Sequence, residues 1–434
     1  MRLHKGLPHA LEMIVASLLI AASSAYAQDA KQGSKFSGVW QFEAARTTPT
    51  PAHTSKLKNA LDLHLQGGFS ENVKWKLGGR VFYDAAYDNS NFYPPAVERD
   101  QRKEARALEN YLDISKGDWD FRLGRQHIIW GEVVGLFFAD VVSAKDMRES
   151  VLPEFDRLRI PQWATRAEYS KNDFHLEAIW IPYMTYDKIG KPGADFYPLP
   201  PPGPAGFGYV IRDEVIPARN RSNTSYGVRL SYLTNGWDMS GFFYRSVDAS
   251  PVFVREIQAS PTPAFVYTPE HHKISQAGFT LAKDLGDMVL KAEMVYTKDR
   301  QYTVTRLTDD DGLVKQNTLD YIVGLEWPLF QDSRMNVQFF GRSVANHDPD
   351  TLFKKNDNGV TLLWSTKVGN WEPQVLLISS LRRSDWLARP RATWNFARNW
   401  RAAFGVDIFG GESTGFFGRF DNKDRVYGEL RYAF

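Results

Sequence analysis

Cysteine is absent from the 434 residues, which excludes disulfides, thiolate metal ligands and cysteine nucleophiles. Long apolar runs are also missing. After the N-terminal segment, no stretch approaches the roughly 18 apolar residues that a transmembrane helix needs. The chain also lacks a large net charge, because 53 basic residues accompany 51 acidic ones. Nucleic acid, which is bound through a basic surface, is therefore not a predicted partner.

The N-terminal segment has the layout of a secretory signal peptide. Positive charges at Arg2 and Lys5 precede the apolar run M-I-V-A-S-L-L-I-A-A, which is too short to span a bilayer. The small-x-small sequence A-Y-A, ending at Ala27, then supplies a cleavage site. We expect residues 1–27 to be removed near Ala27 and residues 28–434 to form a single exported domain.

The C-terminal sequence R-V-Y-G-E-L-R-Y-A-F alternates strictly between apolar and polar residues. This alternation predicts a β-strand with one apolar and one wet face. Similar runs of about ten residues recur upstream, and ten is roughly the length of a tilted transmembrane strand. Leu430, Tyr432 and Phe434 share the apolar face and resemble the C-terminal signal of outer-membrane proteins. The barrel-assembly machinery and outer-membrane lipid are therefore expected partners.

Short polar turns alternate with long irregular connections along the chain, as in outer-membrane barrels. Several turns are followed at once by an aromatic residue, which is typical of a membrane-interface girdle. About eight short hairpins, an initial strand and a final strand predict an all-β transmembrane antiparallel barrel of about 18 strands with an aqueous lumen. Sixteen strands is the alternative if the weak run at 107–114 is miscounted. The turns with an aromatic are G-D-W at 117–119, N-D-F at 172–174, N-G-W at 235–237, G-N-W at 369–371 and R-N-W at 398–400.

Charged residues on the strands are expected to face the lumen, because a charge facing lipid at the midplane costs about 2–4 kcal/mol. The two signs are nearly balanced, so no ion preference follows. Either some arginines form a basic track for carboxylate-bearing solutes, or the wall carries scattered solvated ion pairs. The inward residues are predicted to be Arg80, Arg122, Arg229, Arg342, Arg391, Arg401, Asp320 and Glu326, with Asp62, Asp113, Glu293, Asp407 and Glu429 also on the inner face.

The third long outer connection, residues 131–161 (the third loop), is unusually apolar, with several Val, Leu and Phe residues before Val142. Exposing this surface to water would be costly, so we expect the loop to fold into the lumen and to constrict or plug it. The alternative is packing on neighbouring loops above the membrane. A short helix is predicted over 141–150, with Asp140 or Ser143 as its cap. The residues expected to line the narrowest passage are Glu132, Asp140, Lys145, Asp146, Arg148 and Glu149.

The stretch R-L-G-R-Q-H-I-I-W-G-E, residues 122–132, resembles the G-R-Q…W-G-E signature of a proteobacterial outer-membrane family of unknown function (domain of unknown function thirteen-oh-two). The preceding E-N-Y-L-D-I-S, residues 109–115, is also similar to that family. The resemblance implies a barrel grouped with porin-like and alginate-export-like proteins, without an agreed substrate. Arg125 breaks the alternation set by Arg122, so we expect a bulge or kink near Gly124.

No nucleophile elbow, P-loop or H-E-x-x-H motif is present, so the sequence predicts no enzyme, cofactor or metal site. The adjacent E-H-H at 270–272 is not a convergent ligand set, because neighbouring strand residues point in opposite directions. The predicted function is a Gram-negative outer-membrane channel that passes small solutes and is constricted by the third loop. The alternative is gated or partner-assisted transport of a hydrophobic compound or a polysaccharide, with periplasmic partners.

Overall fold

The computed structural model describes residues 33–88, 90–133, 138–200, 206–259 and 263–434. The predicted signal peptide, residues 1–27, and the cleavage site at Ala27 lie outside the described residues. None of the helices in the described ranges is long and apolar enough to cross a membrane.

Antiparallel strands close into an 18-strand barrel, because β1 pairs with both β2 and β24. The prediction of about eighteen strands is thus confirmed. In ring order the strands are β1 (Lys35–Thr47), β2 (Thr54–Ser70), β3 (Val73–Asp84), β4 (Lys103–Ala107) continued by β5 (Asn110–Lys116), β6 (Trp119–Gln126), β9 (Gln162–Lys171), β10 (Phe174–Tyr183), β12 (Ser225–Thr234), β13 (Trp237–Val247), β16 (Lys273–Asp284), β17 (Val289–Thr303), β18 (Leu313–Pro328), β19 (Ser333–Ala345), β20 (Asn356–Thr366), β21 (Trp371–Ser380), β22 (Asp385–Ala397), β23 (Trp400–Gly411) and β24 (Arg425–Ala433).

The fourth strand is interrupted, which explains its weak alternation in the sequence. Both β4 and β5 pair with β3, but their registers differ by one residue across the gap. The gap holds Leu108, whose amide donates to the Gly78 carbonyl at 2.9 Å, and Glu109. One extra residue opposite an unbroken partner strand is a β-bulge.

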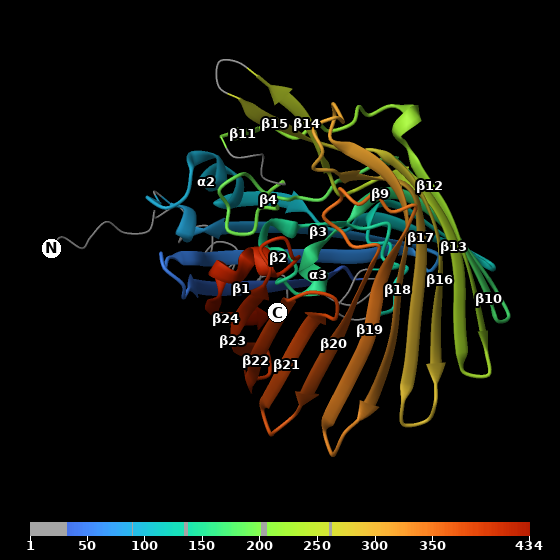
Figure 1. Cartoon of the computed structure of the whole chain (residues 1–434). Coiled ribbons are helices and arrows are strands. Elements are labelled where there is room, and N and C mark those ends of the chain that lie inside the picture. The colour runs from blue at the N-terminus through green and yellow to red at the C-terminus, as the bar shows by residue number, and fades with distance from the viewer. Residues whose placement is uncertain (1–32, 89, 134–137, 201–205, 260–262) are drawn as a thin grey trace.

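Short turns lie at one end of the barrel and long connections at the other (Figure 1). Asn172 and Asn235 in two of the short turns have φ of 52° and 48°, which Asn tolerates and which tight hairpins need. The first and last strands meet at the short-turn end, where the Gly38 amide donates to the Phe434 carbonyl at 2.9 Å. Both ends of the barrel chain therefore lie on the same side.

The outer surface of the barrel is an apolar belt. On β12, Tyr226, Val228 and Leu230 are 48–51% exposed. Ser225, on the opposite face of the same strand, is fully buried on the inner side. Contiguous apolar surface of this extent is costly in water and is accommodated by lipid.

Aromatic residues form a girdle at the short-turn end. The ring of Trp371 stacks on Trp394 with centroids 5.4 Å apart. Trp400 lies 4.6 Å from Tyr432, and Phe174 lies 4.5 Å from Tyr232. Phe174, Trp371 and Trp400 are the aromatics that the sequence predicted directly after short turns, and each packs on an aromatic of the neighbouring strand.

The remaining elements lie in the long connections, and three of them form a small sheet, in the order β11, β15, β14, beyond the long-loop end (Figure 1). Phe253, Phe265 and Tyr267 of this sheet belong to one apolar cluster. The elements are η1 (Ala85–Tyr87), α2 (Pro95–Gln101), β7 (Ala144–Lys145), η2 (Met147–Glu149), α3 (Phe155–Leu158), β8 (Arg159–Ile160), β11 (Gly208–Ile211), η3 (Arg221–Asn223), β14 (Val252–Gln258), β15 (Ala264–Glu270) and η4 (Gly418–Lys423).

Candidate functional site

The G-R-Q…W-G-E segment directs the chain from β6 into the barrel. Gly124 has φ of +130°, and a Cβ at this position would lie 2.3 Å from the Asn110 carbonyl oxygen, so glycine is required. The expected kink near Gly124 is therefore confirmed. Trp130 is fully buried and donates from Nε1 to Glu177 Oε1 of β10 at 2.7 Å. Its ring packs on Phe242 of β13 with centroids 5.1 Å apart.

A single wall carboxylate, Glu293 of β17, binds the backbone of the third loop, which the structure extends to residues 127–161 between β6 and β9. Its oxygens accept from the amides of Glu132, Val133 and Ala139 at 2.5, 2.7 and 2.8 Å. The Glu132 carboxylate lies 3.3 Å from Nη2 of Arg229 on β12. Charge-assisted hydrogen bonds of this kind are about twice as strong as neutral ones, so this end of the loop is firmly held.

The far end of the third loop reaches the opposite wall. Glu149 accepts from Lys56 of β2 at 2.5 Å and from Arg425 of β24 at 3.2 Å. Because β2 lies halfway round the ring from β17, the loop crosses the lumen between these contacts. Figure 1 draws α3 of this loop within the ring of strands. The prediction that the third loop folds inward is confirmed.

The predicted helix over 141–150 is wrong, since only η2 within it is helical. Ala144 and Lys145 instead pair with residues 159–160, and the Lys145 amide donates to Asp187 at 2.7 Å. These contacts supply the backbone partners that a helix would have provided. Asp140 is not a cap; it is buried and bound to Arg159 at 2.7 Å.

Asp146 and Arg148 join the third loop to the fourth strand. Arg106 of β4 donates to Asp146 at 2.9 Å, and Arg148 lies 2.8 Å from Glu104 and 2.6 Å from Asp146. Burial alone would raise the pKa of Asp146, but the hydrogen bond and charge of Arg148, with the charge of Arg106, hold that pKa well below its usual range. The carboxylate therefore stays ionised at neutral pH.

Glu154 forms a further contact that the sequence did not predict. Its carboxylate lies 3.2 Å from Arg391, 3.1 Å from Arg401 and 3.6 Å from Arg431, on three neighbouring strands. Burial would raise the pKa of Glu154, but the three arginines outweigh burial and lower it. Arg391 and Arg401, which were predicted to face the lumen, thus bind the loop, as Arg229 does through Glu132.

The other predicted wall charges are paired across neighbouring strands. Arg80 lies 2.6 Å from Asp62, Arg122 lies 2.6 Å from Asp113, and Arg342 lies 2.5 Å from Asp320. Glu326 is different, because it sits beside a short turn and contacts Arg334 at 3.4 Å rather than a described residue of the third loop. The described wall therefore carries compensated ion pairs rather than an uninterrupted basic track.

Open space lies on one side of the third loop. A cavity of about 710 Å³ separates Phe138, Val141 and Met147 from the inner wall. It is lined by aromatic rings such as Phe340 and by Arg300, which lies 2.8 Å from Asp248. A space of about 50 Å³ lies toward β1–β4, and one of about 40 Å³ lies toward β1, β22 and β24.

The sequence analysis did not name several residues that anchor the third loop, among them Lys56, Glu154, Glu177 and Arg425. Strand alternation could have found Lys56, which shares the inner face with Asp62. Alternation in the last strand places Arg425 on the same wet face as Glu429, but does not give its partner in the loop. Glu177 lies in a run that was not assigned. Glu154 lies in a loop, where no periodicity gives the direction of a side chain.

Solved structures of outer-membrane proteins share the fold. The chain matches Acinetobacter baumannii OccAB1 with a TM-score of 0.57 at 8% identity, covering 92% of this chain and 96% of that one. Pseudomonas aeruginosa OccK8 (OprE) gives 0.53 at 10% identity, covering 92% and 98%. The outer membrane protein opdK from Pseudomonas aeruginosa gives 0.52 at 8% identity, covering 92% and 99%.

No curated protein matches the chain. One family model matches residues 46–434, and its description is "Protein of unknown function (DUF1302)". The match includes the G-R-Q…W-G-E segment and all strands from β2 onward. The chain belongs to the DUF1302 family of proteins of unknown function, as its signature residues implied.

Proposed function

We propose that this protein is an outer-membrane channel of a Gram-negative bacterium that passes small solutes, and that the third loop constricts its lumen. The observation that carries the proposal is the loop's course from Glu293 on one wall to Lys56 on the opposite wall. A loop fixed at both ends across a closed barrel narrows the passage without needing a partner. The likeness in fold to outer-membrane proteins supports the location.

The solute is proposed to pass along the cavity side of the loop, where the space of about 710 Å³ is far larger than the spaces of about 50 and 40 Å³ on the other side. This side combines the rings of Phe340 and Phe353 with the guanidinium groups of Arg300 and Arg342. Such a surface suits a small solute that carries an apolar part and an anionic group, because Arg300 and Arg342 keep N–H donors beyond those bound to Asp248 and Asp320. Selection by this surface is part of the proposal.

A second candidate is gated or partner-assisted transport of a hydrophobic compound or a polysaccharide. It is favoured by the number of ion pairs that hold the third loop and by a contact from the next long connection. There, Lys188 exchanges backbone hydrogen bonds with Lys145 and Met147, at 2.9 and 2.8 Å. A loop held this firmly acts as a plug if the remaining cavity is too narrow for flow.

The test is single-channel conductance in a planar bilayer. In the key variant, residues 146–158 are replaced by Asn-Gly. Because Lys145 already pairs with Arg159, a two-residue hairpin turn joins these ends without strain. Asp310→Asn, at an exposed loop tip, is the control.

A conducting wild type that is exceeded by the shortened variant supports the constricted channel. A silent wild type with a conducting variant favours the plug and the second candidate. Silence of both, in barrels shown to be folded by heat-modifiable gel mobility, would overturn the channel proposal.

We further propose that the barrel-assembly machinery recognises the C-terminal strand. Leu430 and Tyr432 pair with β1 at the closing seam, and Phe434 packs 5.9 Å from Phe36. Deleting Phe434 is expected to lower the amount of assembled barrel in the outer membrane several-fold, measured by heat-modifiable mobility of membrane fractions. Unchanged assembly would contradict recognition of this residue.

A further inference from the structure

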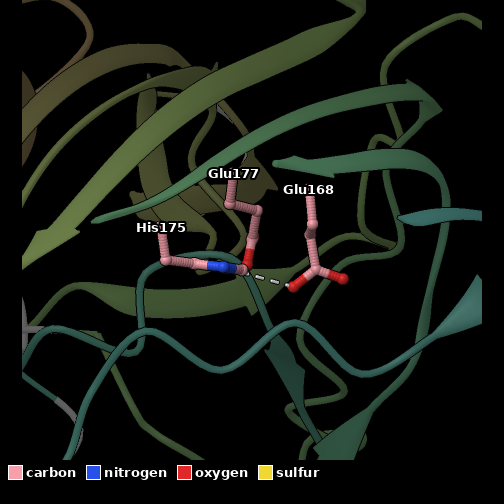
Figure 2. Close-up of side chains that lie close together, drawn as sticks. All are labelled: Glu168, His175 and Glu177. Carbon is pink, nitrogen blue, oxygen red and sulfur yellow. Dashed lines mark ion pairs between the residues drawn. The ribbon is translucent and has the colours of Figure 1, made fainter. Parts of the chain in front are cut away.

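Three side chains with metal-ligand chemistry converge on the inner wall beside the turn between β9 and β10. The strand register pairs Glu177 directly with Glu168, and His175 lies two residues nearer the turn on the same face. In the part of the chain that the structure describes, one ligand atom from each of the three lies within 4.8 Å of the others. Figure 2 shows the imidazole and both carboxylates directed toward one point.

Each of these ligands is oriented by a contact through its other polar atom. Arg166 lies 2.8 Å from Oε2 of Glu168, the Ser170 hydroxyl lies 2.8 Å from the imidazole Nδ1, and Trp130 donates to Oε1 of Glu177 at 2.7 Å. Metal ligands are commonly oriented in this way by a second set of hydrogen bonds.

The remaining atoms face one another. Oε1 of Glu168 and Nε2 of His175 are 3.3 Å apart, and Oε2 of Glu177 makes no hydrogen bond to a described residue. With Nδ1 protonated, the lone pair of Nε2 would point at a carboxylate oxygen. In this tautomer, with Nδ1 donating to Ser170, Nε2 is free to bind a cation beside the carboxylates.

We propose that Glu168, His175 and Glu177 bind a divalent transition-metal ion, with Zn²⁺ as the best fit. Two carboxylate oxygens and one imidazole nitrogen are zinc ligands, and three protein ligands leave a position for water. Ca²⁺ and Mg²⁺ prefer oxygen ligands alone and should bind more weakly. The imidazole is 37% exposed, so an ion can enter from the lumen.

The neighbouring charges permit a cation. Arg166 contacts Glu168, and Arg229 is opposite Glu177 in the register with β12. The carboxylate of Glu132 lies 3.3 Å from Arg229 and offsets its charge. Because the Arg229–Glu132 pair carries no net charge, the two carboxylates of the site exceed the one guanidinium group, that of Arg166, that contacts them. A bound ion would also fix Glu177, and with it the hydrogen bond that anchors Trp130.

The test is calorimetric titration of the untagged full barrel, stripped with EDTA, using ZnCl₂, CaCl₂ and MgCl₂ separately. One Zn²⁺ per barrel is expected, and His175→Ala and Glu168→Gln are each expected to weaken binding about 10–100-fold. His64→Ala is the matched control, because His64 also faces the lumen but lies on β2. Heat-modifiable mobility confirms that each variant is folded.

A second readout is the visible absorption of Co²⁺, whose intensity reports coordination by protein ligands. Absence of Zn²⁺ binding to the folded wild type would overturn the proposal. So would unchanged affinity in both site variants, or an equal loss in His64→Ala. Equal affinity for Ca²⁺ would overturn the role of the imidazole nitrogen. None of these outcomes depends on conductance, so the site and the channel are tested separately.

Discussion

Replacing Glu149 with Gln is expected to weaken the attachment of the far end of the third loop to the wall. The carboxylate lies between Lys56 at 2.5 Å and Arg425 at 3.2 Å, and all three side chains are less than one-fifth exposed. Removing one partner from a buried ion pair costs about 3–5 kcal/mol, because a buried charge is left uncompensated. Each cation keeps a second carboxylate, since Glu43 lies 3.4 Å from Lys56 and Asp407 lies 2.8 Å from Arg425. We therefore expect the lower end, about 3 kcal/mol.

A loss of about 3 kcal/mol corresponds to a roughly 100-fold higher population of the detached loop, since about 1.4 kcal/mol is one factor of ten. Single-channel recordings should show this as more frequent or longer dwells at a higher conductance. Glu71→Gln in the exposed turn between β2 and β3 is the matched control. Identical recordings from wild type and Glu149→Gln, both folded, would refute the assignment of this contact as an anchor.

The same contact predicts a pH dependence. Burial would raise the pKa of Glu149, but Lys56 and Arg425 outweigh burial and lower it below its usual range. Because the pKa of Glu149 is lower in the bound loop, its contribution to holding the loop is complete above the unfolded pKa of about 4.3. That contribution declines as pH falls toward the lowered pKa. Wild-type conductance should therefore rise below about pH 4. Glu149→Gln should lack this part of the rise, and an equal acid response in both would exclude Glu149 as its source.

Two further substitutions test the beginning of the third loop. Trp130→Phe removes the hydrogen bond to Glu177 and should lower the free energy of unfolding by about 1–3 kcal/mol, seen as a lower urea midpoint; an unchanged midpoint would contradict the anchor. Gly124→Ala should lose at least about 3 kcal/mol, because φ is +130° and the new Cβ would overlap the Asn110 carbonyl. Gly117→Ala is its control, with φ of +60° and no heavy atom within 4 Å of the new Cβ, and should lose only about 1 kcal/mol.

Alternation and turn chemistry were sufficient to predict the barrel. The period of two in the last strand fixes which residues meet lipid, and turns such as that at Asn235 fix where each hairpin reverses. The apolar composition of the third loop was sufficient to predict its inward course. These features are local, or depend only on the transfer of apolar surface from water, so they can be predicted from a single sequence.

The contacts of the candidate site could be predicted only in part. The inward direction of Glu293 follows from strand parity, but its three amide partners depend on the path of a loop without periodicity. The helix expected over 141–150 failed because long-range pairing with residues 159–160 supplied its backbone partners. The sequence did not indicate the three residues of the proposed metal site, because they come from two strands. The Asn172 turn could have revealed them, since it sets Glu168 opposite Glu177.

The Trp130-Gly131-Glu132 triplet has a consequence for comparing chains of this family. All three residues serve to dock the loop: the tryptophan on Glu177, the glutamate on Arg229, and the glycine where a Cβ would lie 3.0 Å from the Asp140 amide nitrogen. None of the three lines the large cavity. A chain that keeps this triplet is thus expected to keep a third loop that crosses the lumen, while its cavity residues can vary. Membership of the family and the identity of the solute then become separate questions, and the solute is expected to depend on cavity residues outside the signature.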